Sequence, residues 1–171
     1  MDWAVCSKVD EPAPCPLVRH ACAVDLPALN VVIERAAMNW PLPARLRKRV
    51  IPVLRYDHVD LDCLEIFVYC FAERTVGVLA LDFDGARAQD QSQPVTLHGL
   101  FIDPGFQRQG LGRKLVAFAE QHARDRARDA ISLRAERFSC AFFERCAYTH
   151  IPPKSEDDYP YVYCKGGLIR R

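Results

Sequence analysis

Two glycines near the middle of the chain, Gly110 and Gly112, follow an expected turn and open an expected helix. The first N–H groups of a helix have no partners within the helix and lie at the positive end of its dipole. Glycine lets a ligand approach this backbone closely, and Arg108, Arg113 and Lys114 add positive charge. The spacing therefore predicts a turn that binds phosphate, with a nucleotide or a coenzyme as its ligand.

The segment 107–112 resembles the (Arg/Gln)-x-x-Gly-x-(Gly/Ala) motif of the GNAT acyltransferase superfamily. In that family the turn holds the pyrophosphate of acetyl-CoA, and the backbone at the end of the preceding strand pairs with the pantetheine arm. The strand 95–102 and the Asp-Pro pair that follows it resemble the family as well. The resemblance implies a set of coenzyme contacts: Leu100, Phe101, Ile102, Gln107, Arg108, Gln109, Gly110, Leu111, Gly112, Arg113 and Phe143.

Other glycine-rich turns fit this segment less well. A dinucleotide-binding turn requires a third glycine where the chain has Leu115, and it follows the first strand of its unit rather than a central one. A P-loop requires Gly-Lys-Ser/Thr at its end, which residues 110–115 do not supply. A turn that only starts a helix remains the plain alternative.

A second segment, 139–148, resembles the family pattern A-x-x-x-Y-E-K-x-G-(F/Y), and it departs from that pattern at a chemical group. The family tyrosine, which commonly protonates the leaving CoA thiolate, is replaced here by Phe143. Phenylalanine has no proton to give. Ser139, four residues earlier on the same expected helix face, and water are the main replacement donors, with Cys140 and two late tyrosines, Tyr161 and Tyr163, as further candidates.

His98, on the expected central strand, is the first candidate for the general base that an acetyl transfer to an amine requires. An imidazole ring titrates near neutral pH, which suits proton removal from an ammonium group. A hydrogen-bonded interior histidine is the alternative role for His98. Glu65, on an earlier expected strand, is the second candidate, against the alternative of an exposed strand position.

Grouped carboxylates around residues 57–65 and an aromatic residue, Trp40, are the candidates for the acceptor side. The carboxylates would attract a substrate that carries an ammonium group, and Trp40 would form an apolar lip. A solvated acidic loop and a core-capping tryptophan are equally open. Neither feature identifies a substrate.

These residues require a set of strands and helices to position them. Periodicity predicts strands at 17–23, 64–72, 75–83, 95–102, 130–135, 148–151 and 161–164. It predicts helices at 26–39, where Asp25 is the expected cap, at 44–51, which Pro52 ends, at 110–128 and at 139–146. This order matches the α/β (α+β) GNAT fold, a mixed and mostly antiparallel twisted sheet of about seven strands flanked by about four helices. Residues 1–16 read as a flexible, proline-rich tail and 17–171 as the acyltransferase domain.

Composition excludes several classes of protein. With 171 residues, of which 50% are hydrophobic and 26% charged, the chain is expected to be globular. The net charge of +1 gives no bulk attraction to nucleic acid, and no segment has the apolar length that crosses a membrane. The eight cysteines contain no C-x-x-C pair, so no metal site is expected. Without a secretory leader at the N-terminus, we expect a cytoplasmic protein.

We therefore expect an acyl-CoA-dependent N-acyltransferase that moves an acetyl group from acetyl-CoA directly to the primary amine of a small molecule or peptide. We expect the protein to bind no metal, nucleic acid or membrane. We expect it to be a monomer or a homodimer. The alternative is a catalytically weak or inactive module of the same fold that binds CoA as a sensor or scaffold. Acceptor, acyl length and oligomeric state stay open.

Overall fold

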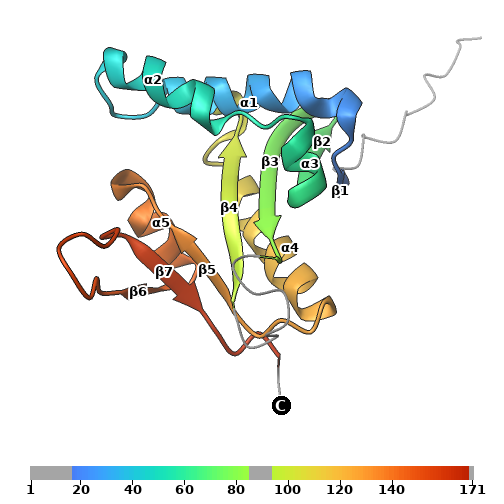
Figure 1. Ribbon diagram of the computed structural model, residues 1–171. Helices are drawn as coiled ribbons and strands as arrows, with labels where there is room; N and C mark the ends of the chain where they lie inside the picture. Colours follow the sequence, from blue (N-terminus) through green and yellow to red (C-terminus); the bar gives the residue numbers. More distant parts are fainter. Residues whose placement is uncertain (1–16, 85–93, 170–171) are drawn as a thin grey trace, which may run out of the picture.

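A seven-stranded sheet forms the centre of the computed structural model, which describes residues 17–84 and 94–169 (Figure 1). The tail expected at 1–16 lies outside the described residues. The strand order is β1-β2-β3-β4-β5-β7-β6, and every neighbouring pair is antiparallel except β4 and β5. The expected fold is confirmed. The strands are β1 (Leu17–His20), β2 (Glu65–Phe71), β3 (Arg74–Asp82), β4 (Val95–Ile102), β5 (Ile131–Arg134), β6 (Thr149–Ile151) and β7 (Val162–Lys165).

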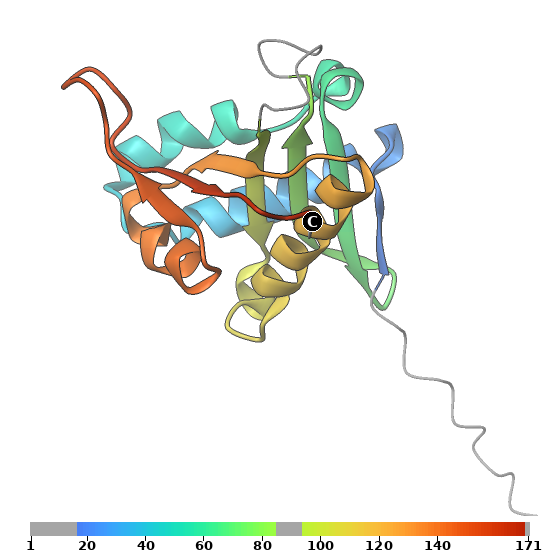
Figure 2. The same cartoon turned by 90° about the horizontal axis from the view of Figure 1, so that it is seen from below.

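Helices cover both faces of the sheet. In Figure 2, α4 lies on one side of β3 and β4, and α1 and α2 lie on the other. The helices are α1 (Leu26–Met38), α2 (Ala44–Leu54), α3 (His58–Cys63), α4 (Leu111–Asp125) and α5 (Cys140–Arg145). Three short 3₁₀ turns join them: η1 (Ala23–Asp25), η2 (Pro104–Phe106) and η3 (Arg137–Ser139).

The central strand β3 explains why the sheet needs helices on both faces. Its side chains are apolar on both sides: Leu79 and Leu81 pack into the cluster beneath α4, whereas Val78 and Ala80 pack into the cluster beneath α1. A strand that is buried on both faces has a nearly continuous apolar sequence instead of an alternating one. Two cores result, one on each side of the sheet.

The expected cap of α1 occupies its predicted position but bonds elsewhere. Asp25 precedes the helix, yet its carboxylate accepts two hydrogen bonds of 2.7 Å from Arg19 and one of 2.9 Å from the Cys22 N–H. The Arg19 guanidinium is the main reason that the pKa of Asp25 lies well below its usual range. The carboxylate therefore fastens β1 to the entry of α1 instead of closing the first turn of the helix.

The prediction that Pro52 ends the second helix is wrong, because α2 continues to Leu54. Proline removes one helical hydrogen bond, here to the carbonyl of Lys48. Both residues lie on the exposed side of α2, where water can hydrate that carbonyl. The loss is thereby reduced, and the helix passes through the proline.

The acidic segment before β2 is a short helix, α3, which the sequence analysis missed. Asp57 accepts the N–H groups of Val59 (2.7 Å) and Asp60 (3.2 Å), and Asp60 accepts the Asp57 N–H (2.8 Å). This reciprocal pattern is a capping box, built here with aspartate in both positions. The two carboxylates are therefore used to start a helix, and the interpretation of the segment as a loop is wrong.

Candidate active site

A groove of about 990 Å³ opens at the end of β4, between α1, the turn before α4, and α5. Most of the residues predicted to bind the coenzyme line it. Gln109 and Leu111 do not, although they belong to the same turn. The lining includes Trp40, His98, Leu100, Phe101, Ile102, Gln107, Arg108, Gly110, Gly112, Arg113, Arg134, Glu136, Phe138, Ser139, Phe142 and Phe143.

The groove exists because β4 and β5 separate. Their parallel pairing covers three positions and stops at Leu97 and Leu133, so the rest of β4 has no pairing with β5. In Figure 1 the half of the sheet with β5, β7 and β6 leans away from β4 toward α5. Backbone groups on this side of 98–101 are thus available to an extended ligand, whereas the Ile102 carbonyl already accepts the Gln107 side chain. The resemblance implied contacts of Leu100, Phe101 and Ile102 with the pantetheine arm, and these contacts stay a prediction.

A buried carboxylate holds the turn that follows β4. Asp103 is 1% exposed and accepts the Gly105 N–H at 3.0 Å. Arg74 and Arg35 approach the same carboxylate at 3.1 and 3.3 Å. Gln107 folds back so that its side chain donates to the Ile102 carbonyl at 2.9 Å. The turn is therefore anchored before it reaches the glycines.

The two glycines have different physical roles. Gly110 is the N-cap of α4 with a φ of 84°, a left-handed conformation that costs an L side chain about 1–2 kcal/mol. A Cβ at Gly110 would meet open space, so only the backbone conformation requires glycine. At Gly112 a Cβ would lie 3.2 Å from Phe142, so this glycine lets α5 approach α4. The first turn of α4, whose N–H groups lack partners within the helix, therefore borders the groove together with Arg108 and Arg113.

His98 lies at a β-bulge in the wall of the groove. In the pairing of β3 with β4, Leu81 faces Leu97 and Ala80 faces Gly99, which leaves His98 as the extra residue. A bulge re-aims the side chain that it inserts. The His98 Nδ1 lies 3.2 Å from the hydroxyl of Tyr56, and the ring is exposed to the groove.

Tyr56 fixes the direction of the His98 ring, and the sequence analysis did not identify it. Its backbone is held by Asn30, which donates to the Tyr56 carbonyl (2.8 Å) and accepts its N–H (2.9 Å). Burial raises the pKa of Tyr56 well above its usual value, so the hydroxyl stays protonated at neutral pH. No local signal indicates the pair, since 42 residues separate Tyr56 from His98.

Phe143, which stands where the family pattern has a tyrosine, lies on the α5 side of the groove. Its ring is 6% exposed and packs edge-on against Phe142 and Tyr148, with centroid distances of 5.0 and 5.9 Å. Ser139 lines the groove, and its hydroxyl donates to the Glu136 carbonyl at 2.8 Å. The structure thus brings Ser139 and Phe143 into the same wall, as their spacing predicts.

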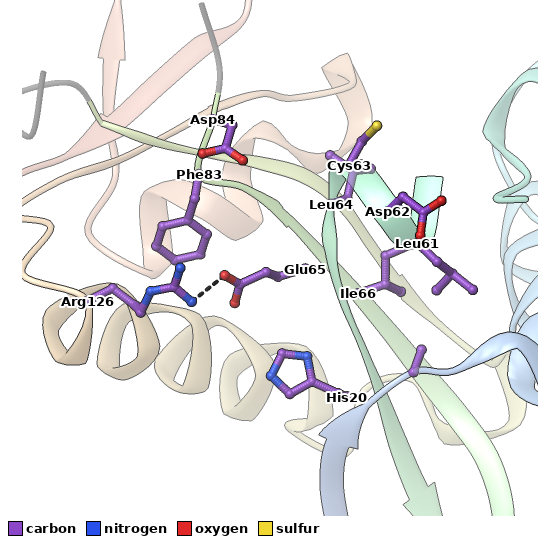
Figure 3. A pocket seen from close by; sticks show the side chains of 11 residues that line it. His20, Leu61, Asp62, Cys63, Leu64, Glu65, Ile66, Phe83, Asp84 and Arg126 are labelled. Carbon is purple, nitrogen blue, oxygen red and sulfur yellow. Dashed lines mark hydrogen bonds and ion pairs between the residues drawn. The ribbon is translucent and has the colours of Figure 1, made fainter. Parts of the chain in front are cut away.

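Glu65, the second predicted base, is not in the groove. It faces the opposite side of β2, where its carboxylate contacts His122 (2.6 Å) and Arg126. It lines a separate pocket (Figure 3). Strand alternation decides this placement, and we therefore exclude Glu65 from the candidate catalytic groups.

Aromatic rings form the other wall of the groove. Trp40 is stacked on Phe101 with a centroid distance of 6.4 Å and contacts Phe138 at 5.1 Å. The predicted acidic cluster of 57–65 does not line the groove; among the lining residues that the structure describes, Glu136 is the only carboxylate. The lining of the groove thus combines aromatic rings with one carboxylate and with several arginines, among them Arg134 and Arg145.

A model of the acetyltransferase (GNAT) family matches residues 33–148. This range includes β4, the glycine turn and α5. No curated protein matches the sequence. None of the helices in the described part of the chain has the length and apolar character to cross a membrane.

Several solved structures share the fold. The PaiA N-acetyltransferase of Thermoplasma acidophilum, in complex with coenzyme A, has a TM-score of 0.75 at 12% identity, covering 89% of this chain and 99% of that one. A GCN5-related N-acetyltransferase from Rhodopseudomonas palustris has a TM-score of 0.69 at 11% identity over 92% and 99% of the chains. A GNAT acetyltransferase from Brucella melitensis in complex with acetyl-CoA has a TM-score of 0.63 at 15% identity, covering 89% of this chain and 88% of that one. At these identities the likeness concerns the fold alone.

Proposed function

Because the chain belongs to the acetyltransferase (GNAT) family, we propose that it transfers an acetyl group from acetyl-CoA to a primary amine. Residues 17–171 act as the catalytic domain. The observation that carries the proposal is the combined geometry of the groove. One wall offers free strand backbone and an anchored glycine turn, and a histidine is exposed at the strand bulge.

The diphosphate of acetyl-CoA binds at the N-terminus of α4. There Gly110 and Gly112 leave the first N–H groups accessible, and Arg108 and Arg113 line the same part of the groove. The pantetheine arm extends along the unpaired side of β4. Backbone hydrogen bonds at Leu100, Phe101 and Ile102 then position the thioester, in the way that a further strand adds to a sheet edge. Two of the structural neighbours contain coenzyme A or acetyl-CoA, which supports this ligand.

His98 removes the proton that activates the amine. When its Nδ1–H donates to the Tyr56 oxygen, the Nε2 lone pair is free to accept a proton from the incoming ammonium group. Tyr56 acts as a positioning residue, because it touches His98 rather than the reacting atoms. A well-placed general base contributes roughly 10²- to 10⁴-fold to the rate.

The neutral amine then attacks the thioester carbonyl carbon directly. The carbonyl oxygen becomes an oxyanion, which accepts a hydrogen bond from a backbone N–H near Phe101 and Ile102. The C–S bond breaks as the amide forms, the attacking nitrogen releases its excess proton to water, and the CoA thiolate takes a proton. Phe143 has no hydroxyl to supply it, so we assign this step to Ser139 or to water.

An amine panel tests the proposal. The purified chain is incubated with acetyl-CoA and with small amines, amino acids and peptides, and release of free CoA thiol is followed. We expect turnover with at least one amine, and acetyl-CoA as the required donor. No thiol release above the rate of spontaneous hydrolysis with any acceptor would contradict the enzyme assignment.

A CoA-binding sensor is the second candidate, and Phe143 is the observation that favours it. A site with no hydroxyl beside the sulfur can bind the coenzyme without releasing the thiolate. Calorimetry with CoA distinguishes the candidates. The sensor binds CoA tightly yet shows no turnover, and the enzyme shows both. Failure to bind CoA at millimolar concentration would exclude both.

A further inference from the structure

A second pocket, of about 300 Å³, lies where β1 ends and β2 begins (Figure 3). It is formed by the end of β1, α3, the start of β2, the residues that follow β3 and Arg126 just beyond α4, and it shares no lining residue with the groove. Its polar side chains have no role in the proposed acetyl transfer. They include His20, Asp62, Cys63, Glu65, Asp84 and Arg126.

Three metal-binding side chains converge beside this pocket from three different elements. His20 ends β1, Glu65 starts β2, and His122 lies in the last turn of α4. One donor atom of each lies within 4.8 Å of the other two, and the His122 Nε2 is 2.6 Å from Glu65 Oε2. Figure 3 shows His20 and Glu65 projecting from neighbouring strands toward the same space.

Aromatic packing holds both histidine rings in place. The His122 ring is parallel to Phe118 within 6° and meets Phe67 and Phe83 edge-on at 5.0 and 5.6 Å. The His20 ring packs on Phe67 at 4.2 Å. Rings that are oriented by their neighbours lose little conformational freedom when they bind a ligand, which favours a preformed site.

The third ligand is oriented as well. One oxygen of Glu65 contacts His122, and the other accepts from Arg126 Nη1. Ligating carboxylates usually have such an outer hydrogen-bond partner. Asp62 and Asp84 add two further carboxylates to the lining of the pocket.

We propose that His20, Glu65 and His122 bind a zinc ion. Two imidazoles and one carboxylate form a donor set that zinc accepts at about 2.0–2.2 Å, in tetrahedral geometry with a fourth position open to the pocket. Small rotations of the three side chains bring their donor atoms from the present spacing around one ion. The ion would join the edge strand β1 to β2 and α4. The cysteine spacing gave no indication of this site, because its ligands come from distant segments.

Zinc titration of chelator-treated protein tests the proposal. By calorimetry we expect one zinc ion per chain at this site. The double variant His20→Asn/His122→Gln should lose this binding. The Arg126→Gln variant removes only the outer partner and should weaken the affinity roughly 10- to 100-fold. The exposed histidine His58, in α3, supplies the matched control His58→Gln, which should bind zinc like the parent.

Cobalt distinguishes this site from the cysteines of the chain. A site of nitrogen and oxygen donors gives Co²⁺ visible d–d bands without the near-ultraviolet charge-transfer band of thiolate ligands. Zinc binding that persists in the double variant, or a thiolate band in the cobalt complex, overturns the proposal, as does the absence of zinc binding. The double variant is folded if its melting temperature, and the change in that temperature when CoA is added, match those of the chelator-treated parent. Loss of zinc binding in a folded variant is then independent of whether the protein transfers acetyl groups.

Discussion

His98 and Phe143 line the same groove with opposite capacities for proton transfer. The imidazole can take a proton, whereas the phenyl ring can neither take nor give one. At the scale of single residues, the proposed chemistry therefore needs His98 as its base and a group other than Phe143 as its acid.

Replacing His98 by glutamine should lower kcat by roughly 10²-fold, because the ring that accepts the amine proton is lost. Affinity for acetyl-CoA, measured by calorimetry, should stay unchanged, since His98 is proposed to touch the acceptor. His150→Gln is the matched control, because His150 bonds the Pro160 carbonyl at 2.8 Å and does not line the groove. Equal kcat values for His98→Gln and His150→Gln would remove His98 from the mechanism.

The Tyr56→Phe variant separates positioning from proton transfer. Loss of the hydroxyl that lies 3.2 Å from His98 should give a smaller fall in kcat than His98→Gln. The effect of Tyr56→Phe should vanish in the His98→Gln background. Additive losses in the double variant would mean that the two residues act separately.

Phe143→Tyr restores the hydroxyl that the family pattern contains. If thiolate protonation limits turnover, kcat should rise roughly tenfold or more, because an acid placed in the groove replaces water or Ser139. Initial rates of thiol release measure this effect. A parallel Phe142→Tyr variant tests whether any added hydroxyl in this wall has the same effect. A kcat that stays the same in Phe143→Tyr would show that the proton is not limiting.

At the scale of elements, the turn between β4 and α4 has two separate supports. One is the left-handed Gly110, and the other is the buried Asp103 with its two arginines. Sequence reasoning identified the first from the glycine spacing. It did not identify the second, because Arg35 and Arg74 reach Asp103 from α1 and β3.

Gly110→Ala should strain the turn by about 1–2 kcal/mol, since the added side chain disfavours the left-handed conformation. We expect a weaker affinity for CoA, by roughly tenfold, together with a lower midpoint in urea. Gly166→Ala is the control, because a Cβ there would lie 4.0 Å from its nearest neighbour. A Gly110→Ala protein with unaltered CoA affinity would contradict the role of this turn.

Asp103→Asn should destabilise the protein by about 1–3 kcal/mol, because a buried carboxylate that bonds two arginines and the Gly105 N–H loses its charge. Both arginines are about half exposed, with 49% and 53% of their side-chain surface accessible, so water replaces part of the loss. Urea unfolding measures the change. Glu156→Gln, in an exposed loop, should change stability by less than about 0.5 kcal/mol.

At the scale of the whole molecule, the groove proposed to bind acetyl-CoA lies across the gap between β4 and the second half of the sheet. A ligand there contacts β4, α4 and α5 together, so its binding energy adds to the stability of the whole fold. A free concentration 100 times Kd contributes about 2.7 kcal/mol. In a chain of this length, each kcal/mol of stabilisation raises Tm by about 2–4 °C. We therefore expect acetyl-CoA to raise Tm by roughly 5–10 °C.

Thermal unfolding with increasing acetyl-CoA checks this expectation, and NAD is the matched negative control. The glycine turn lacks the third glycine of a dinucleotide site, so NAD should leave Tm unchanged. An equal shift with NAD would favour a dinucleotide-binding protein over the proposed function.

Local features of the sequence sufficed for the fold and for the strand and glycine turn that line one side of the groove. Strand β4 has the predicted bounds, and Gly110 and Gly112 begin α4 as expected, because periodicity and turn chemistry act within about ten residues. The resemblance to the family followed from the same local patterns. The contacts attributed to the coenzyme stay predictions.

The directions of the His98 and Glu65 side chains depend on contacts between distant segments. A bulge of one residue changes the alternation of β4 and turns His98 toward Tyr56, and the alternation of β2 turns Glu65 toward His122. These partners lie 42 and 57 residues away along the chain. Side-chain direction in a strand depends on register, and register is set by pairing with other strands, so no local pattern contains it.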